Sequence, residues 1–440
     1  MEDSYIINGG KKISGTITLS GAKNAALKMI IASLLFNSKV VLENVPLIND
    51  VKELIHLINL LGVKTRFLEK NILEIDPSDL SINKVDMLHG SKIRVSFMLF
   101  ASLLYKFGEC YIPNPGGCRI GARPIDRIIE GMRSLGIEVN YDSNTGYYQA
   151  KMIKKPTGYY CFIKPTHTGT ELLIMLSVFS DSKVIIDNAA TEPEIDNLID
   201  FLNLAGGKIK RIGKKIEIIG GKKLVLNQSF KIILDRNEAV TYVCLAIATK
   251  GKIEIKNISL NLLTSFLEKI KEAGVSYSFK NNSLLFEYNG QLKPVSIETM
   301  SHPGFMTDWQ PNWAILMTQA KGESIIHERV FENRFSYVDQ LKKLGARIEK
   351  IEIKVDKPEE FYFFNYQENQ IYNQAIKITG PVNLHSGVLE IKDLRAGATL
   401  AVAALVANGQ SVVNNVSILE RGYENFVNKI RALGGEIKKV

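Results

Sequence analysis

The chain has 440 residues, of which 45% are hydrophobic and 23% are charged, a composition typical of a globular protein with sizeable hydrophobic cores. Its 55 basic and 46 acidic residues give a net charge of +9, which fits either an anionic partner or a lysine-rich surface. No stretch approaches the roughly 20 consecutive apolar residues of a membrane-spanning helix, and the composition is not that of a disordered or coiled-coil chain.

The four cysteines, Cys110, Cys118, Cys161 and Cys244, are scattered without any C-x-x-C pair. This spacing argues against a disulfide framework or a structural zinc site, and it favours a reducing compartment. The sequence runs from Met1 almost directly into a strand-like segment, with no visible signal peptide. We therefore expect a cytoplasmic protein.

The first predicted elements form a unit that recurs along the chain. Residues 21–35 predict an apolar helix and residues 40–42 a strand. Asp50 is expected to cap a second helix with apolar residues at helical spacing, and Gly62 beyond its end supplies a left-handed cap.

The same plan returns five times, at intervals of about 70 residues and nearer 90 for the last. The later end glycines are Gly136, Gly206, Gly274, Gly345 and Gly434. Repeats of solenoids run only about 20 to 50 residues, so each unit is expected to be compact, with two helices and about four strands. Six units predict an α/β protein of two domains with three units each. The extra length falls in the aromatic stretch 359–374, which we expect to form a surface hairpin.

Several units place a basic or small residue where the first helix begins. These starts are at Lys23, Arg94, Thr168 to Thr170, Arg236 and Arg395. Helix N-termini present free N–H groups and partial positive charge, so they bind phosphates and carboxylates, although small residues also serve for close packing. Asp308 holds the matching place in the fifth unit, where an acid is either a cap or a base for a hydroxyl substrate.

The segment from Pro113 to Asp126 is the most informative part of the sequence. Its prolines and glycines predict an exposed, sharply turning loop. Cys118 is flanked by Arg119, with Arg123 and Arg127 following, and cationic neighbours stabilise a thiolate. We expect Cys118 to be reactive, whereas the other three cysteines lie in apolar contexts and are expected to be shielded packing residues.

The sequence contains no motif typical of a metal site or of a nucleotide cofactor site. The six histidines have no metal-ligand spacing, and no Walker A loop or G-x-G-x-x-G follows a strand. We expect no metal and no organic cofactor. His167 and His302 lie in predicted loops, within reach of a ligand.

Eight segments occur in the order of a known family. They are SGAKNAAL at 20–27, PGGCRIGARPID at 115–126, AATEPEI at 189–195, DRNE at 235–238, TD at 307–308, VFENRF at 330–335, DLRA at 393–396 and RGY at 421–423. Together they closely resemble the UDP-N-acetylglucosamine 1-carboxyvinyltransferases, a family of enolpyruvyl transferases. The resemblance implies two similar domains, each an inside-out α/β barrel of three repeats, with residues 1–21 and 235–440 in one domain and 22–234 in the other.

The resemblance also implies a reaction, in which the enolpyruvyl group of phosphoenolpyruvate moves to the 3′-hydroxyl of UDP-N-acetylglucosamine and phosphate is released. This step opens peptidoglycan precursor synthesis. The implied catalytic residues are Cys118 as the general acid, Asp308 facing the sugar hydroxyl, and Lys23. The implied phosphoenolpyruvate-binding residues are Lys23, Asn24, Arg123, Arg395 and Arg421. The implied UDP-N-acetylglucosamine-binding residues are Arg94, Arg123, Pro124, Ile125, Asp126, Arg127, Lys164, Pro165, Thr166, His167, Asp308 and Val330. We expect these two small molecules as partners of a monomer, with no nucleic acid and no membrane.

Three alternatives stay open at this point. The first is the sister enzyme that makes enolpyruvylshikimate phosphate on the same fold, which lacks the loop cysteine. The second is a paralogue acting on another nucleotide sugar, because the chain departs from the family pattern at Ile48, Asn49, Arg119, Thr191 and Trp309. The third is a non-enzymatic, basic nucleic-acid-binding protein, which would need exposed aromatics interleaved with basic residues.

Overall fold

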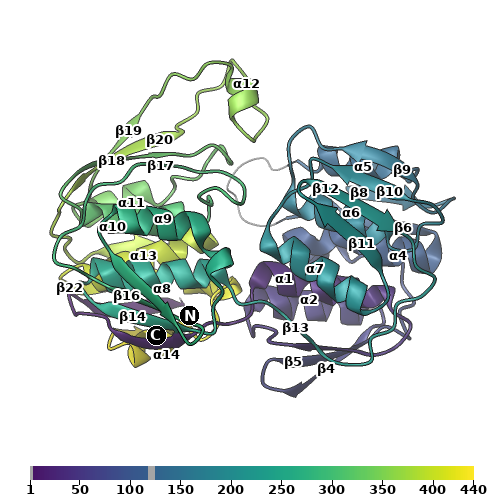
Figure 1. Ribbon diagram of the computed structural model, residues 1–440, viewed down its shortest axis with the longest axis horizontal. Helices are drawn as coiled ribbons and strands as arrows, with labels where there is room; N and C mark the ends of the chain where they lie inside the picture. Colours follow the sequence, from purple (N-terminus) through teal and green to yellow (C-terminus); the bar gives the residue numbers. More distant parts are fainter. Residues whose placement is uncertain (1–2, 117–123) are drawn as a thin grey trace. The chain divides into compact units, whose positions relative to one another are not determined.

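The computed structural model describes residues 3–116 and 124–440, and their contacts divide into two compact units (Figure 1). Unit 1 holds residues 3–20 and 234–440, and unit 2 holds residues 21–116 and 124–233. The chain passes into unit 2 after Ser20 and returns after Ile233, each time one residue before the expected boundary. Three residues with expected roles, Cys118, Arg119 and Arg123, lie outside the described residues.

In its described residues, unit 2 contains a pair of principal helices in each of three repeats, additional short helices, and three small sheets. Its helices are α1 (Lys23–Ala32), η1 (Ser33–Leu35), α2 (Asn49–Leu60), α3 (Met87–Gly90), η2 (Arg94–Leu99), α4 (Phe100–Phe107), α5 (Asp126–Ser134), α6 (His167–Ser177) and α7 (Pro193–Leu204). Its strands are β3 (Val40–Glu43), β4 (Lys64–Glu69), β5 (Ile72–Asp76), β6 (Glu109–Pro113), β7 (Glu138–Asp142), β8 (Tyr147–Lys151), β9 (Gly158–Cys161), β10 (Val184–Asp187), β11 (Lys208–Ile212), β12 (Lys215–Ile219) and β13 (Phe230–Lys231).

Unit 1 follows the same plan. Its helices are α8 (Arg236–Ala248), η3 (Leu260–Leu262), α9 (Thr264–Glu272), α10 (Gln310–Thr318), α11 (Val338–Lys343), α12 (Pro358–Phe361), α13 (Leu394–Val406), η4 (Val416–Arg421) and α14 (Phe426–Ala432). Its strands are β1 (Ser4–Gly9), β2 (Gly15–Thr18), β14 (Lys252–Lys256), β15 (Ser276–Lys280), β16 (Ser283–Glu287), β17 (Ile297–Glu298), β18 (Gly322–His327), β19 (Arg347–Ile351), β20 (Ala375–Gly380), β21 (Val388–Glu390), β22 (Gly409–Asn414) and β23 (Glu436–Lys439).

The six sheets of residues 3–116 and 124–440 repeat one topology, a parallel edge strand followed by three antiparallel strands. The four-stranded sheets have the orders β13-β3-β5-β4, β9-β10-β12-β11, β2-β14-β16-β15, β17-β18-β20-β19 and β21-β22-β1-β23. The sixth, β6-β8-β7, has a parallel bridge from Lys84 to Tyr111 in place of the edge strand. Strand β1 from the chain start completes the last sheet of unit 1, and β13 completes the first sheet of unit 2, so each unit closes on itself. The prediction of six repeated units is confirmed.

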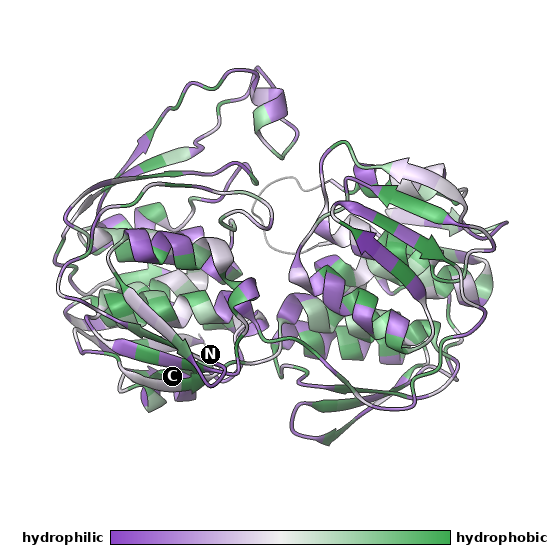
Figure 2. Ribbon diagram, in the orientation of Figure 1, coloured by the Kyte–Doolittle hydropathy of each residue, from purple (hydrophilic) through white to green (hydrophobic). Residues whose placement is uncertain are grey.

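The first helix of each repeat lies inside its unit. In unit 1, every residue of α8 and α10 is buried, as is all of α13 except its last residue, and the three helices pack against one another. A helix that is apolar all round is stable only when covered on all sides. The strands alternate instead: in β14, Ile253 and Ile255 are buried while Lys252 and Lys256 are exposed. The sheets therefore form the outer layer, and Figure 2 shows hydrophobic residues along the inner helices.

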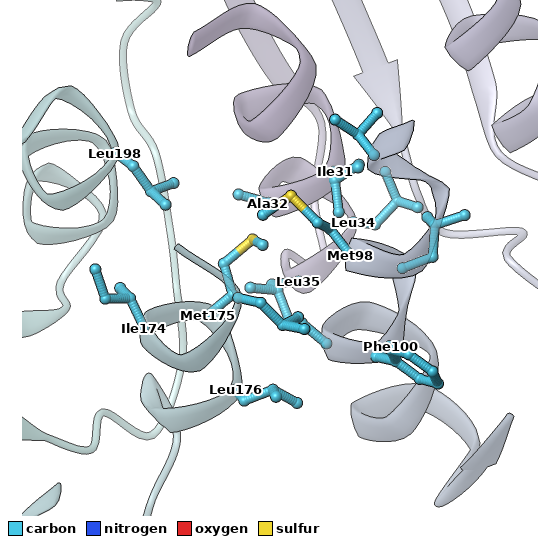
Figure 3. Close-up of a cluster of buried hydrophobic side chains, with 14 of the residues drawn as sticks. Ile31, Ala32, Leu34, Leu35, Met98, Phe100, Ile174, Met175, Leu176 and Leu198 are labelled. Carbon is cyan, nitrogen blue, oxygen red and sulfur yellow. The ribbon is translucent and has the colours of Figure 1, made fainter. Parts of the chain in front are cut away.

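The core of unit 2 is built from the inner helices. Ile31 of α1, Leu35 of η1, Met98 of η2, Phe100 of α4 and Met175 of α6 are all buried and belong to one cluster (Figure 3). These residues come from three different repeats, so the core joins the repeats into one domain-sized unit.

The second helices end where the sequence predicts. The six end glycines have left-handed φ angles, 101° at Gly62, 92° at Gly136, 102° at Gly206, 86° at Gly274, 87° at Gly345 and 89° at Gly434. Only glycine adopts these angles without strain, because it has no Cβ, so the predicted cap is confirmed in all six repeats.

The prediction of a hairpin for residues 359–374 is wrong. Residues 352–374, all of them described, contain the short helix α12 but no strand, and they connect the antiparallel strands β19 and β20. The aromatic side chains pack on one another and on neighbouring cations, instead of alternating between the two faces of a β-hairpin. The guanidinium of Arg329 lies 3.7 Å from the ring centre of Phe361, and Tyr362 stacks on Phe364 at 5.0 Å. In the described part of the chain, no helix combines the length and apolar character needed to cross a membrane.

Candidate active site

Asp308 lies in the turn before α10, between two guanidinium groups of unit 1. Its Oδ1 accepts a hydrogen bond from Nη2 of Arg334 at 2.6 Å, and its Oδ2 accepts one from Nε of Arg395 at 3.0 Å. The side chains of Arg334 and Arg395 are only 3% and 5% exposed, whereas that of Asp308 is 21% exposed. Helix α10 is preceded by Trp309 and has no side-chain cap, so the alternative of Asp308 as a helix cap is wrong.

Arg395 is the first basic residue of α13 and is held from several sides. Oδ1 of Asp393 caps the helix by accepting from the backbone N–H groups of Arg395 and Ala396, both at 3.1 Å. Burial is the largest influence on the pKa of Arg395 and lowers it, but the charges of Asp308, Tyr423 and Asp235 and the hydrogen bond to Asp308 together raise it above its ordinary value. Among the described residues, Nη1 of Arg395 is buried and has no hydrogen-bond partner. A permanent cation with a free donor is suited to binding a carboxylate.

The other expected residues of unit 1 come from two later loops. Val330 is half-buried in the loop after β18, and its N–H donates to Oε1 of Glu328 at 2.8 Å. Arg421 is half-buried at the end of η4. The ring of Tyr423, two residues later, lies 5.6 Å from the guanidinium of Arg395.

Lys23 and Asp50 form a nearly buried ion pair in unit 2. Lys23 is the first residue of α1, and its Nζ lies 2.7 Å from Oδ2 of Asp50. Asp50 was expected to cap the second helix, but α2 begins at Asn49 without a side-chain cap, so that prediction is wrong. The carboxylate points to Lys23 instead and orients its ammonium group. Asn24, half-buried, follows in the same helix.

The segment from Lys164 to His167 lies at the start of α6. Thr166 caps the helix, with Oγ1 accepting from the N–H of Gly169 at 3.4 Å. Nε2 of His167 lies 3.2 Å from Oε1 of the buried Glu171, whose Oε2 lies 3.2 Å from Nζ of Lys28. Burial lowers the pKa of His167 and the charge of Glu171 raises it, with a net increase above the ordinary value. Lys164 and Pro165 are half-buried.

The remaining expected residues of unit 2 also lie at helix starts. Arg94 begins η2, with its guanidinium 5.8 Å from the ring of Phe97. Pro124 is exposed, and the buried Ile125 precedes α5, whose first residue is the exposed Asp126. The next residue, Arg127, is half-buried, and burial lowers its pKa.

Four charged residues have defined partners that the sequence did not predict, and of these only Asp50 had been given a role, that of a helix cap. They are Lys28, Asp50, Glu171 and Arg334. A signal was present for Lys28, since it interrupts the apolar run of an inner helix, where a charge needs a partner. Arg334 stands within the quoted VFENRF segment, but nothing in the sequence alone places it against Asp308.

The cysteines differ from one another. Cys110 and Cys244 are buried, and burial raises the pKa of both thiols. Cys161 is exposed, so the prediction that it is shielded is wrong. It ends the edge strand β9, where its neighbour Tyr160 faces the core and Cys161 faces the opposite way. No group of three His, Cys, Asp or Glu side chains suited to a metal ion occurs among residues 3–116 and 124–440.

Comparisons with known proteins agree with one another. A family model described as EPSP synthase (3-phosphoshikimate 1-carboxyvinyltransferase) matches residues 7–430. The UDP-N-acetylglucosamine 1-carboxyvinyltransferase of Campylobacter hominis is 37% identical over 440 residues, with 99% of each chain covered. The protein of the same name from Halothermothrix orenii is 36% identical over 437 residues, again with 99% of each chain covered.

Solved structures share the fold. The enolpyruvyl transferase NikO from Streptomyces tendae has a TM-score of 0.85 at 21% identity, covering 100% of this chain and 99% of that chain. EPSP synthase from Acinetobacter baumannii has a TM-score of 0.73 at 16% identity, with both chains fully covered. The predicted fold, an inside-out α/β barrel in each of two domains, is confirmed. From its full-length matches, this chain belongs to the enolpyruvyl transferase family and, within it, groups with the UDP-N-acetylglucosamine 1-carboxyvinyltransferases.

Proposed function

We propose that this enzyme transfers the enolpyruvyl group of phosphoenolpyruvate to the 3′-hydroxyl of UDP-N-acetylglucosamine and releases phosphate, the first committed step of peptidoglycan precursor synthesis. The relatives with this name cover nearly the whole chain. The observation that carries the proposal is the pairing of Asp308 with Arg395, because it puts a carboxylate beside a buried cation that has a donor to spare.

The reaction sets the chemistry that the residues must supply. The sugar oxygen forms a bond to C2 of phosphoenolpyruvate while its own proton leaves and C3 gains a proton. In the second half, C3 gives up a proton and the bond from C2 to the phosphate oxygen breaks. The site therefore needs a base for the hydroxyl, an acid for C3, and cations for the phosphate and carboxylate.

The residues divide among these tasks. Asp308 accepts the proton of the hydroxyl, and Cys118 delivers the proton to C3. Lys23, Asn24, Arg123, Arg395 and Arg421 bind the phosphate and carboxylate of phosphoenolpyruvate. Helix starts at Arg94 and at residues 124–127 and 164–167, together with Val330, bind the nucleotide sugar. The buried ion pair with Asp50 supports this assignment for Lys23, because it fixes the position of an ammonium group at a helix N-terminus.

The test is phosphate release with phosphoenolpyruvate alone, with UDP-N-acetylglucosamine alone, and with both. We expect release only with both, at the same rate in the presence of a chelator. Activity lost to the chelator and restored by a divalent ion would show that a metal takes part. Shikimate 3-phosphate, other nucleotide sugars and single-stranded RNA serve as competing ligands for the three alternatives. Sedimentation of the purified chain, expected as a monomer, tests its oligomeric state.

A further inference from the structure

Arg334, which contacts Asp308, has a protein group near each of its three guanidinium nitrogens. Its Nη2 donates to Oδ1 of Asp308 at 2.6 Å, its Nε donates to Oγ1 of Thr307 at 3.2 Å, and its Nη1 lies 3.6 Å from Oδ1 of Asp393. The side chain is only 3% exposed. All three nitrogens thus face fixed groups of the protein.

The position of Arg334 is itself fixed by a buried carboxylate. Oε2 of Glu328 accepts from the hydroxyl of Thr307 at 2.8 Å, so the lone pairs of that hydroxyl are left for Arg334. Oε1 of Glu328 accepts from the backbone N–H groups of Val330 and Phe331 at 2.8 and 3.1 Å. This chain of contacts ties the loop that carries Arg334 to the turn that carries Asp308.

Arg395 contacts the other oxygen of Asp308 and differs in one respect. Its Nε donates to Oδ2 at 3.0 Å, but its Nη1 is buried without a hydrogen-bond partner among the described residues. Each nitrogen of Arg334 therefore faces a protein group, whereas Arg395 retains a buried donor for an anion. A carboxylate between two guanidinium groups is also a weak base, because both positive charges stabilise its ionised form.

We propose that Arg334 is a positioning residue for the transfer reaction: it holds Asp308 by Oδ1 while the carboxylate of the substrate draws Arg395 away and frees Oδ2 to accept the proton of the sugar hydroxyl. This inference rests on the proposed function, and it adds that Arg395 leaves Asp308 before Asp308 accepts the proton. The proton moves from the hydroxyl oxygen to Oδ2 as the oxygen forms its bond to C2, and C3 takes its proton from the general acid. Without Arg334, Asp308 would lose its orientation when Arg395 moves.

Two substitutions at Arg334 separate charge from geometry. Arg334→Lys keeps the cation but loses the fork that reaches Thr307 and Asp308 together, so kcat should fall by about ten- to a hundredfold with little change in the KM for phosphoenolpyruvate. Arg334→Gln removes the cation that favours ionised Asp308, so the acid limb of the kcat profile should also move up by about one to two pH units.

The surroundings of Asp308 determine how the pH profile is interpreted. Among the described residues, the charged and titratable groups around Asp308 and its two arginines include Glu328 after β18, Asp393 at the start of α13, Asp235 before α8, and Tyr423. Only Arg334 changes between the wild type and the two variants, so a shift of the acid limb reports on its charge.

Matched controls keep the test specific. Arg329→Lys changes another arginine of the same loop, one that pairs with Glu298 and Phe361, and should leave kcat, KM and the acid limb unchanged. Arg395→Lys should raise the KM for phosphoenolpyruvate instead. Thermal unfolding shows whether the Arg334 variants fold. If they do not, Thr307→Val replaces them as the test, because it removes the hydroxyl that accepts from Nε of Arg334 at nearly constant side-chain volume. This variant should lower kcat severalfold.

The outcomes are distinguishable. A wild-type enzyme that fails to release phosphate with both substrates would overturn the proposed function. An active wild type whose Arg334→Lys and Arg334→Gln variants keep kcat and the acid limb would overturn the role of Arg334 alone. An increase in the KM for phosphoenolpyruvate at constant kcat would also overturn it, because Arg334 would then bind the substrate directly.

Discussion

Nζ of Lys23 lies 2.7 Å from Oδ2 of Asp50, which joins the first residue of α1 to the first turn of α2. Both side chains are about nine-tenths buried, so the pair lies in surroundings where an unbalanced charge is costly. The ion pair holds a proposed substrate-binding cation in a fixed place before any substrate arrives.

The first prediction concerns this pair. Asp50→Asn keeps the shape of the side chain but removes its charge from beside a buried ammonium group. We expect the free energy of unfolding, measured in urea, to fall by about 1–3 kcal/mol. Asp79→Asn is the matched control in the same unit, since the pair of Asp79 with Lys64 is exposed and screened by solvent, so its loss should have a much smaller effect. Equal effects of the two substitutions would contradict the structural role of Asp50.

The same pair shows what the sequence could and could not predict. An acid before an apolar helical pattern predicts a cap, because capping depends only on neighbouring residues. The contact with Lys23 joins two helices of one repeat, and its distance depends on how those helices pack. The glycine caps, in contrast, were predictable at all six positions, because a positive φ is a local property of the backbone.

In the site of unit 1, too, local features were predictable and contacts between distant residues were not. Asp308 and Arg395 were identified from motifs, but they lie 87 residues apart in the chain and meet only through the packing of α10 against α13. The sequence places Arg334 in one of the family segments, but it does not predict the contact of Arg334 with Asp308. The exposure of Cys161 is not predictable from the sequence, because its strand is the edge of a sheet and a neighbouring apolar residue does not reveal which face is covered.

A second prediction tests Asp308 itself. Asp308→Asn preserves the shape of the side chain while removing the base proposed for the sugar hydroxyl. We expect kcat to fall by about a hundredfold to ten-thousandfold, with binding of UDP-N-acetylglucosamine largely retained. Rapid-quench measurement of the first turnover separates the chemical step from product release. Normal turnover by this variant would leave Asp308 only a structural role between the two arginines.

A third prediction concerns pH and the stability of unit 2. Burial is the largest influence on the pKa of His167 and lowers it, but the charge and hydrogen bond of Glu171 and the charge of Glu192 together raise it above its ordinary value of 6.5. The native state then binds this proton more tightly than the unfolded state. The stabilisation is fully present below pH 6.5 and is lost as the pH rises through the higher pKa of the native state.

Comparison with His167→Gln measures this effect. The advantage of the wild type in free energy of unfolding should be largest near pH 6 and should shrink as the pH rises, by at most about 1.4 kcal/mol per pH unit. A difference between the wild type and His167→Gln that stays constant with pH would mean that the histidine carries no extra proton in the native state.

The last prediction concerns the thiols. A neutral alkylating reagent such as N-ethylmaleimide needs only an accessible thiol, so it should label the exposed Cys161 as well as Cys118, and spare the buried Cys110 and Cys244. The phosphonate epoxide fosfomycin carries an anionic group that resembles the substrate phosphate. It should therefore label Cys118 alone, because the cations proposed to bind phosphoenolpyruvate would hold it there.

Peptide mapping distinguishes these reactions. Fosfomycin labelling of Cys118 should speed up with UDP-N-acetylglucosamine and slow down with phosphoenolpyruvate, which competes for the same cations, while maleimide labelling of Cys161 should respond to neither.

Cys161→Ala, the matched control, should keep full activity. Cys118→Ser should lose most of it, because a hydroxyl is a far weaker acid, whereas Cys118→Asp should keep activity and escape the epoxide, since a partly protonated carboxyl can still deliver a proton. Fosfomycin found on Cys161, or a fully active Cys118→Ser enzyme, would remove Cys118 from the proposed mechanism.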